Sequence, residues 1–373
     1  MVFSLFLWAA LAGAGSLLMT IPFNQKHSRK TGLPLGTLVH VGPQKEGPVK
    51  ITLFDYDANS FIEQDIHDVQ ECYPFRDKPS ITWINVDGVH KDEVIADLGK
   101  NFVLHPLVVE DIVYTNQRPK MEDYGDYLYI VLKMLHKNKQ GEGFVAEQVS
   151  LIVGNNFVIS FQESADGDVF DPIRQQIRTG KGRLRKMGAD YLVYALIDTV
   201  IDYYFVVLET IGEKIESLEE ETVTNPNQKT LRNIHVLKRD MLFLRRAVWP
   251  LREVITGLGR SPGIVSDSIA LYLRDAYDHA IQIMDTIENY CEMLSGMLDI
   301  YLSSINNRLN EVIKVLTIIT TIFMPLSVIT GLYGMNFKFI PGADNASGFY
   351  EIVGLLLFIA FLMLLYFKRK KWI

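Results

Sequence analysis

The residues with the most distinctive chemistry lie at positions 331–337, which read GLYGMNF. They close an apolar run, residues 315–332, that carries no charge. The stretch has neither a helix cap nor a basic anchor, and instead offers backbone carbonyls beside glycine and the side-chain amide of Asn336. Neutral oxygen dipoles can hold a cation strongly enough to select it and weakly enough to release it. Glycine also lets the backbone approach an ion, because no side chain intervenes.

Acidic residues offer a second type of chemistry. Asp275, Asp278 and His279 are spaced i, i+3, i+4, which puts them on one face of a helix where they can hold a cation. A solvated or salt-bridged helix face explains the same spacing. Glu110 and Asp111 are adjacent acids at the end of a predicted helix, and both explanations apply to them as well.

The sequence contains none of the common enzyme motifs. It has no GxxxxGK[ST], no GxGxxG after a strand, no HExxH and no GxSxG. Cys72 and Cys291 form no CxxC pair, which excludes a disulfide framework and a cysteine zinc site and suits a cytosolic body. We therefore predict that the protein is not an enzyme and has no organic cofactor.

The charge distribution indicates which partners the protein meets. The formal net charge is -7, although the last six residues, KRKKWI, contribute four positive charges. The remainder of the chain is therefore more acidic than the total. An acidic body argues against a nucleic-acid partner, which requires a basic face, and suits a body that meets cations.

Two apolar segments near the C-terminus predict a membrane hairpin. Residues 315–332 and residues 349–367 are each long enough to cross a bilayer core. The basic tail, residues 368–373, predicts a cytoplasmic C-terminus by the positive-inside rule. The large N-terminal body is then cytoplasmic too, and residues 333–348 form the loop on the outer side. The alternative is a buried hairpin in the core of a soluble protein.

The first 30 residues are apolar but fit no single pattern. Residues 1–23 carry no charge, and the basic residues follow the apolar run rather than precede it. This order disfavours a cleaved secretory signal. It leaves an N-out span, an in-plane anchor, or an upstream start that adds residues the fold does not need. We assign residues 1–30 as an N-terminal apolar extension.

The body between these segments divides by its hydrophobic pattern. Residues 31–170 predict a cytoplasmic α/β domain, with helices at about 91–101 and 106–113. A hairpin turn is expected at 154–156. Predicted strands, rich in β-branched and aromatic residues, span 37–41, 49–54, 81–86, 127–135, 147–154 and 156–162. Residues 171–262 predict a cytoplasmic helical region, which Asn225-Pro226-Asn227 breaks into an antiparallel pair.

The most unusual element is a very long predicted helix. Between Gly263 and Pro325 there is no proline and a single glycine, Gly296, so residues 263–332 predict a stalk helix that continues into the first membrane span. A lone stalk cannot bury its apolar stripe. The pattern therefore predicts a bundle of several copies, hence an oligomer.

One face of the first span alternates polar and apolar side chains at steps of three and four. In a ring of such helices this stripe would line a narrow pore, and the apolar members would gate it by dewetting. Helix packing explains its small residues but not Asn310, whereas the threonines can also bond back to the preceding turn. The stripe consists of Asn310, Ile313, Leu316, Thr320, Met324, Ser327 and Gly331.

The sequence resembles the CorA family of divalent-cation channels. The resemblance covers about residues 31–373, leaves out residues 1–30, and centres on Gly-Met-Asn between two C-terminal spans. Segments that look like the family include TWINVDGVH, HPLVVEDI, QRPKMEDY, WPLREV, YDHAIQIMDTIE, VIKVLTIITTIFMPL and YGMNF. One departure is the loop after the motif, which is often acidic in relatives. Here it holds Lys338 and no Glu, with Asp344 or Glu351 as possible substitutes.

The resemblance implies a homopentamer with an α/β cytoplasmic funnel domain, a long stalk helix, a C-terminal two-helix transmembrane hairpin and lipid-facing second spans. It implies a selectivity filter of Gly334, Met335 and Asn336 at the outer pore mouth. It further implies regulatory Mg²⁺ binding between subunits by Asp111 and Asp275, with Glu110 nearby. Asp299 matches a position on the stalk, and the stripe defined above matches stalk and pore-lining positions.

The expected function is a passive channel in the inner membrane. It would import hydrated Mg²⁺, and also Co²⁺ with Ni²⁺ as a further candidate, and intracellular Mg²⁺ at the subunit interfaces would close it. Mg²⁺ is then both the substrate and the regulatory ligand, and the lipid bilayer is the other partner. Two alternatives remain: a zinc transporter of the same family, and a membrane-anchored scaffold or sensor that conducts nothing.

Overall fold

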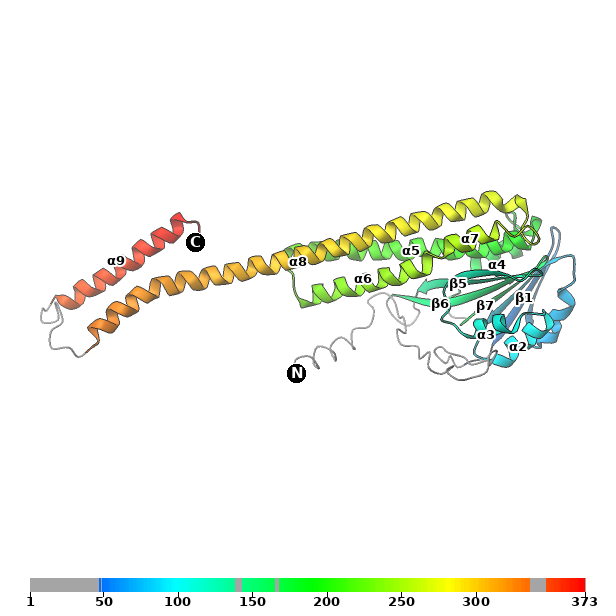
Figure 1. The fold of residues 1–373 in the computed structure, drawn as a ribbon, viewed down its shortest axis with the longest axis horizontal. Helices are drawn as coiled ribbons and strands as arrows, with labels where there is room; N and C mark the ends of the chain where they lie inside the picture. Colours follow the sequence, from blue (N-terminus) through cyan, green and yellow to red (C-terminus); the bar gives the residue numbers. More distant parts are fainter. Residues whose placement is uncertain (1–46, 48, 138–142, 165–167, 336–346, 373) are drawn as a thin grey trace. The chain divides into compact units, whose positions relative to one another are not determined.

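The computed structural model describes residues 47, 49–137, 143–164, 168–335 and 347–372 (Figure 1). Contacts divide the chain into two compact units. The first unit comprises Met1–Glu221 and Asn227–Met297, and the second comprises Thr222–Pro226 and Leu298–Ile373. The predicted extension at 1–30 and the predicted strand at 37–41 lie outside the described residues.

Within the described part of the first unit, a seven-stranded sheet has the order β2-β1-β3-β7-β6-β5-β4. The strands are β1 Lys50–Tyr56, β2 Phe61–Ile66, β3 Ile81–Asp87, β4 Lys120–Asp123, β5 Leu128–Lys137, β6 Phe144–Val153 and β7 Phe157–Gln162. Neighbouring strands are antiparallel except for β3 and β7, which are parallel. The inner strands are buried along almost their whole length because helices cover both faces, which explains their nearly continuous apolar sequences.

Two helices and a 3-10 helix cover one face of this sheet (Figure 1). They are η2 Val69–Phe75, α2 Asp92–Asn101 and α3 Pro106–Val113. Their buried side chains join those of the strands in one core cluster. Helix α2 packs closely on α3, since a Cβ atom at Gly99 would lie 2.6 Å from Cγ2 of Val109. This packing fixes α3, which carries Glu110 and Asp111.

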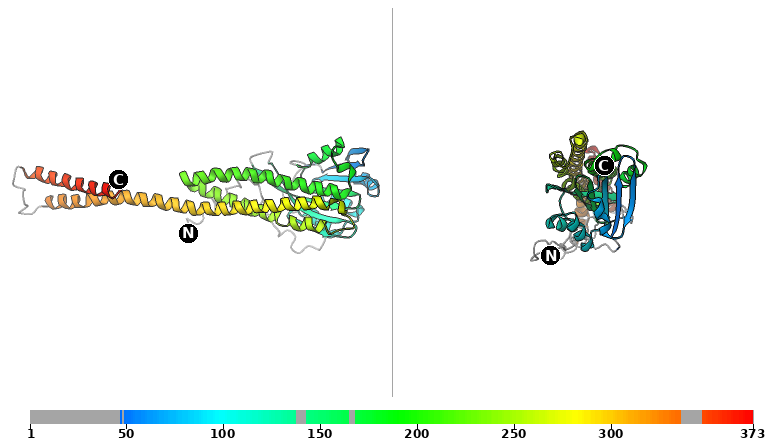
Figure 2. Two further views of the ribbon diagram at one scale, coloured as in Figure 1. Left: turned by 90° about the horizontal axis from the view of Figure 1, so that it is seen from above. Right: turned by 90° about the vertical axis from the view of Figure 1, so that its right-hand side faces the viewer.

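The other face of the sheet carries four helices, among them the long helix α5 (Figures 1 and 2). They are α4 Asp171–Thr179, α5 Ala189–Thr224, α6 Gln228–Val248 and α7 Leu251–Leu258. The hydroxyl of Tyr204 in α5 donates a hydrogen bond to the carbonyl of Lys133 in β5, which ties α5 to the sheet. The predicted break between α5 and α6 is confirmed, and Asn227 caps α6 in a capping box with Thr230.

Helix α8, Ala270–Tyr333, contains 64 residues. Its N-terminal part lies along α5 (Figure 2), where the rings of Tyr191 and Tyr272 meet edge to face at 5.2 Å. Gly212 of α5 makes room for Tyr290 of α8, because a Cβ atom there would collide with the tyrosine hydroxyl. The amphipathic part of the long helix is therefore buried against its own chain on one side.

A buried polar network crosses the parallel pair β3 and β7. Trp83 Nε1 donates to Ser160 Oγ at 2.9 Å, and Ser160 Oγ donates to Asn85 Oδ1 at 2.6 Å. Gln162 Nε2 donates to the same Asn85 oxygen at 2.9 Å, while Asn85 Nδ2 donates to Asp87 Oδ1 at 2.9 Å. Such a network has full strength in only one register, so it specifies how the two strands pair.

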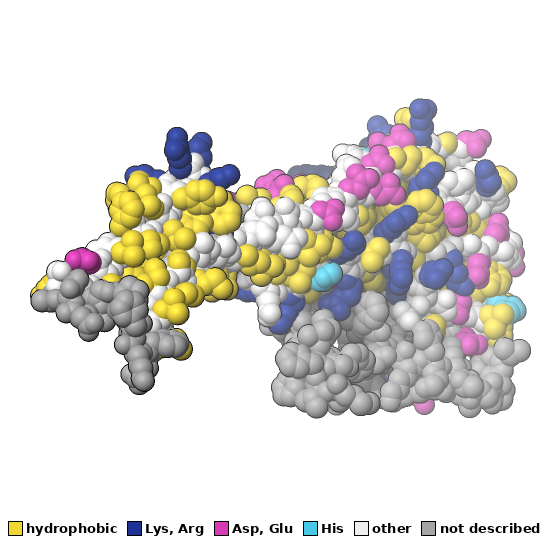
Figure 3. Space-filling model, turned by 60° about the vertical axis from the view of Figure 1, so that its left-hand side comes forward, with side chains coloured by type: hydrophobic (Ala, Val, Ile, Leu, Met, Phe, Trp, Pro, Cys, Tyr) yellow, Lys and Arg dark blue, Asp and Glu magenta, His cyan; other side chains and the backbone are white. Residues whose placement is uncertain are grey.

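The second unit contains the end of α8 and helix α9, Gly348–Arg369. By length and composition, three described helices could cross a membrane: α5, α8 and α9. Of the apolar window of α5, 56% is buried inside the chain, against 6% in α8 and in α9. Helix α5 is thus covered by protein, whereas the other two present their apolar side chains outward (Figure 3).

The structure differs from the sequence predictions at three places. Helix α8 begins at Ala270 rather than near Gly263, because the residues before it form turns and a short 3-10 helix, η4 Asp267–Ile269. Strands β2 and β4 were not predicted, since β2 is mostly exposed and β4 is a short, charged edge strand.

Replacing Asp87 by Asn tests the buried network. Burial, and next the Asp168 carboxylate, raise the pKa of Asp87 to about 6. Because its folded-state pKa is raised, Asp87 costs no stability below about pH 4, where it is protonated in both states. Its ionisation destabilises the fold increasingly as the pH rises through 6. Asp87→Asn should therefore stabilise the full chain by about 2 kcal/mol at pH 7 and flatten this dependence in thermal unfolding. Asp77→Asn, at an exposed site, is the control, and equal pH slopes in all three proteins would contradict the prediction.

Candidate ion-pathway and metal-binding sites

The predicted pore stripe lies on the membrane part of α8. Every residue of the stripe is helical and exposed in the single chain. Leu316 is 62% exposed and Met324 is 67% exposed, but residues on the other faces of this part of α8 are similarly open. Polarity rather than exposure therefore distinguishes the stripe, which carries an amide and hydroxyls among large apolar side chains.

The threonine hydroxyls of this span bond to their own helix. Thr317 Oγ1 donates to the Ile313 carbonyl and Thr320 Oγ1 to the Leu316 carbonyl, both at 2.8 Å. Thr330 Oγ1 donates to the Leu326 carbonyl at 3.0 Å. The interpretation that these hydroxyls bond back to the preceding turn is confirmed for these three residues. Each keeps a lone pair for a passing water molecule while leaving no unsatisfied donor in the span.

Proline lies inside α8 at Pro325. Because proline has no N–H, the Thr321 carbonyl lacks its usual helical donor. Such a site allows a membrane helix to bend when neighbouring groups or water satisfy the freed oxygen. The turn at Pro325 is therefore less stiff than the other turns of the helix.

The helix ends where the Gly-Met-Asn motif begins. The Gly334 N–H donates to the Thr330 carbonyl at 2.9 Å, and the Met335 N–H donates to the Leu332 carbonyl at 3.3 Å. The Met335 side chain is 48% exposed. Gly334 and Met335 thus stand at the tip of α8, while Asn336 lies outside the described residues.

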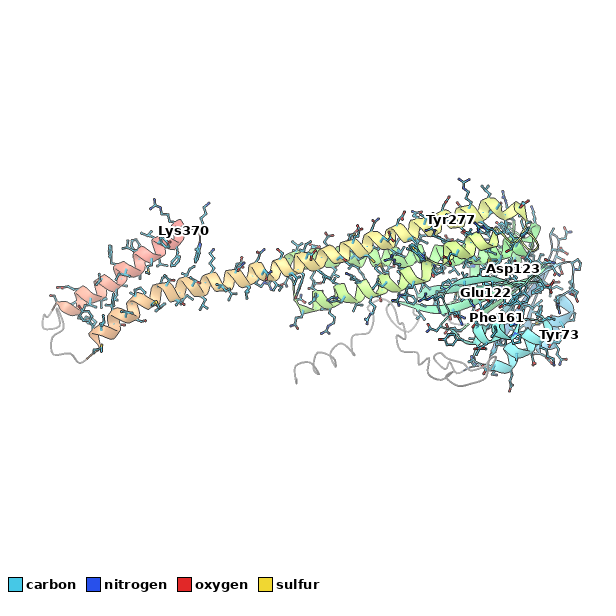
Figure 4. The ribbon with its side chains drawn as sticks, viewed as in Figure 1. Tyr73, Glu122, Asp123, Phe161, Tyr277 and Lys370 are labelled. Carbon is cyan, nitrogen blue, oxygen red and sulfur yellow. The ribbon has the colours of Figure 1, made fainter. Side chains whose placement is uncertain are left out.

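Asp111, at the C-terminal end of α3, forms an ion pair with Lys120. Lys120 Nζ of β4 donates to Asp111 Oδ2 at 2.7 Å and to Glu122 Oε1 at 2.7 Å (Glu122 is labelled in Figure 4). Gln117 Nε2 donates to the other Asp111 oxygen at 2.7 Å. Partial burial lowers the pKa of Lys120, but the hydrogen bonds and charges of Asp111 and Glu122 outweigh it, so that the net pKa is raised.

Asp275 stands on an exposed face of α8 near two acids of α5. Burial, and next the charge of Asp202, raise the pKa of Asp198, and Asp275 adds to this effect. The charge of His279 opposes it. Tyr194 donates its hydroxyl to Asp198 Oδ2 at 3.2 Å. This face therefore concentrates negative charge, which His279 partly balances.

The remaining predicted ligands lie apart from these groups in one chain. Glu110 is half-buried on α3, and Asp299 is exposed on the part of α8 that belongs to the second unit. Among the described residues, no hydrogen bond or ion pair joins Asp111 to Asp275, and no group of three or more His, Cys, Asp and Glu could hold a metal ion. A metal site that uses Asp111 or Asp275 would need ligands from another copy or from water.

Sequence reasoning missed several of these groups. Asp198 and Asp202 are spaced i, i+4 on a predicted helix, which is a signal that could have found them. Lys120 gave no local signal, because only the fold brings β4 to the end of α3. Lys314 Nζ donates to the Lys371 carbonyl at 3.3 Å, which joins the base of the first span to the basic tail. Lys370, in that tail, is labelled in Figure 4.

Comparison with known proteins identifies the family. Residues 78–369 match the family described as CorA-like Mg²⁺ transporter protein. This chain belongs to the CorA family. It is 47% identical over 347 residues to the cobalt/magnesium transport protein CorA of Thermotoga maritima, an alignment that covers 93% of this chain and 98% of that protein.

Solved structures of CorA relatives share the fold. The complete structure of the CorA magnesium transporter from Methanocaldococcus jannaschii matches with a TM-score of 0.72 at 24% identity, covering 87% of this chain and 98% of that one. The full-length CmaX protein matches with a TM-score of 0.68 at 22% identity, covering 88% and 99%. The sheet, the long helix and the C-terminal helix are therefore features that this chain shares with a CorA transporter.

Replacing Lys120 by Met tests whether Lys120 competes with a metal for Asp111. An exposed or partly exposed ion pair contributes about 1 kcal/mol, so its loss should let Mg²⁺ occupy Asp111 at roughly fivefold lower concentration. The measurement is protection of the full chain from chymotrypsin as Mg²⁺ is increased. Lys91→Met, at an exposed site, should leave the midpoint unchanged. A midpoint in Lys120→Met that is equal to or above that of the control would refute the competition.

Proposed function

We propose that this chain is the subunit of a channel that passes Mg²⁺ and Co²⁺ across a cell membrane without chemical energy. The observation that carries the proposal is the uncharged stripe on α8, which the sequence Gly334-Met335-Asn336 follows in this member of the CorA family. A pump or a proton-coupled carrier usually needs ionisable groups at membrane depth. Residues 315–332 hold none. The membrane potential would then drive the cations inward.

Selection by water-mediated contacts suits this end of the helix. Mg²⁺ gives up its water slowly, so a site that required dehydration would be slow. The Gly334 carbonyls and Asn336 amides of several subunits could instead bind the hydrated ion through its waters. Below them, rings of Leu316 and Met324 would stop hydrated ions whenever the helices close together and the pore dries.

A homopentamer is the assembly that we propose for this pore. The membrane part of α8 has 6% of its apolar window buried in one chain, so its faces need other helices and lipid. A closed ring of identical subunits would give every stripe the same axial position. Helix α9 would then face lipid. The basic end of α9, Lys368 to Lys371, would lie on the cytoplasmic side of the inner membrane together with the first unit.

Regulation would act through the two acidic regions of the first unit. We propose that Asp275 of one subunit and Asp111 of its neighbour share Mg²⁺, with Glu110 close by, and that this bound ion holds the ring closed. When Mg²⁺ falls, the acids around Asp275 would repel one another and loosen the interface. Such a ligand shifts a two-state assembly because it binds the closed state better.

Substitution of Asn336 tests the selectivity site. In liposomes with a Mg²⁺-sensitive dye and an imposed membrane potential, Asn336→Ala should reduce Mg²⁺ uptake at least tenfold, since the oxygen dipole is lost. Asn336→Asp should bind the ion too tightly for selective flux. Asn59→Ala, in a distant turn, serves as the control. Uptake at the wild-type rate in either Asn336 variant would contradict this proposal, as would a preference for Zn²⁺ in the wild-type protein or no flux at all.

Reversing the charge of Asp275 tests the regulation. Asp275→Lys removes a ligand and places an ammonium group beside Asp198, so the channel should stay open as internal Mg²⁺ is increased. Asp285→Lys is the matched control because Asp285 is an exposed acid further along the same helix. The measurement is flux from liposomes loaded with a range of Mg²⁺ concentrations. An unchanged Mg²⁺ response in Asp275→Lys would count against the mechanism.

A further inference from the structure

Three neighbouring clefts lie along α6, α7 and the start of α8, all within the first unit. Their volumes are about 420, 320 and 330 Å³, and the largest falls in the range of small-molecule sites. The largest cleft shares Thr256, Arg260 and Tyr277 with the cleft of 320 Å³, and it shares Trp249 with the cleft of 330 Å³. They therefore form a nearly continuous hollow surface, which we call the arginine clefts.

The lining is unusually cationic for a chain with a net charge of -7. Its arginines are Arg118, Arg245, Arg246, Arg252, Arg260 and Arg274, and its one acid is Glu253. Across the part of the chain that the structure describes, none of these six guanidinium groups forms an ion pair within 4.0 Å. Several like charges gathered in concave surfaces repel one another and attract a polyanion.

Two aromatic rings flank these charges. Trp249 is 49% exposed, and Tyr277 comes from α8 on the other side of the largest cleft (Tyr277 is labelled in Figure 4). Arg252 Nη2 donates to the Tyr277 hydroxyl at 3.0 Å, which holds the guanidinium group in place. Arg252 Nε is buried and has no hydrogen-bond partner among the described residues. The wall of the cleft therefore holds a guanidinium group in a fixed orientation.

We propose that the arginine clefts bind a nucleoside triphosphate. Arginine is suited to phosphate because its planar fork donates two parallel hydrogen bonds to phosphate oxygens. Arg252 and Arg260 would hold the phosphates. A base would stack on the exposed ring of Trp249, an arrangement that tolerates different bases.

The same chemistry predicts a dependence on Mg²⁺. Mg²⁺ binds the phosphate oxygens of nucleotides and cancels part of their negative charge. The arginine clefts should therefore bind the metal-free triphosphate more tightly than its Mg²⁺ complex. If the proposed function holds, the arginine clefts would bind more nucleotide when Mg²⁺ is scarce. The nucleotide, rather than the ion itself, would then signal the shortage.

Calorimetric titration of the detergent-purified full chain with ATP in EDTA tests this inference, and it does not depend on transport. Arg252→Gln should weaken ATP binding about tenfold, since it removes a charge-assisted hydrogen bond. Trp249→Ala should weaken ATP binding about tenfold but leave inorganic triphosphate binding unchanged. Added Mg²⁺ should weaken ATP binding in the wild-type protein.

The controls separate this site from other roles of the arginines. Arg239→Gln, an exposed arginine of α6 that lines none of these clefts, should bind ATP as the wild type does. Arg260→Gln, at an exposed position, repeats the charge test if Arg252→Gln fails to fold. The proposal is wrong if the wild type does not bind ATP or if both arginine variants bind it normally. It is also wrong if these variants dissociate the oligomer while the wild type does not bind ATP. The clefts would then bind carboxylates of a neighbouring copy.

Discussion

One continuous helix has to be stable both in water and in lipid in this protein, and the other elements depend on that constraint. In lipid every backbone polar group needs an internal partner, because no water is available to satisfy it. Helix α8 runs from Ala270 to Tyr333 without a loop and meets this condition except at the Thr321 carbonyl, where Pro325 supplies no N–H. Its threonines return their hydroxyls to the preceding carbonyls, so oxygen atoms are present in the span at little cost. The apolar faces that remain call for lipid and further helices, while the N-terminal part is already covered by α5.

The carboxylates of the first unit differ in how they are balanced. Asp111 is paired with Lys120 and receives a hydrogen bond from Gln117, so a metal ion must displace an ammonium group to reach it. Asp275 instead lies near Asp198, whose pKa is raised by burial and by the charge of Asp202, so a divalent ion there would relieve repulsion. A metal ion shared by both regions would relieve repulsion near Asp275, but it would compete with Lys120 for Asp111. Such an arrangement makes occupancy sensitive to concentration rather than permanent.

The sequence alone predicted the elements that are set by strong, local patterns. The strands at 81–86 and 156–162, the break at Asn227 and the long helix are present because their residues obey clear periodicities or turn rules. Strand β4 was missed because its pairing partner and α7 define it, not its own four residues. Of the candidate sites, the stripe and the tip of α8 could be expected from spacing. The partner of Asp111 could not, since Lys120 is brought to it only when β4 joins the sheet edge.

Pro325 gives the long helix a compliant joint close to its outer end. The missing hydrogen bond to the Thr321 carbonyl lowers the resistance to bending at one turn only. A rod that is stiff along its stalk and soft at one level transmits displacement up to that level and absorbs part of it there. Residues 326–333, and the Gly334 carbonyl beyond them, can therefore keep nearly the same geometry while the stalk tilts. For the channel that we propose, the mechanical consequence is that opening the pore and choosing the ion need not disturb each other, although the same helix would carry both.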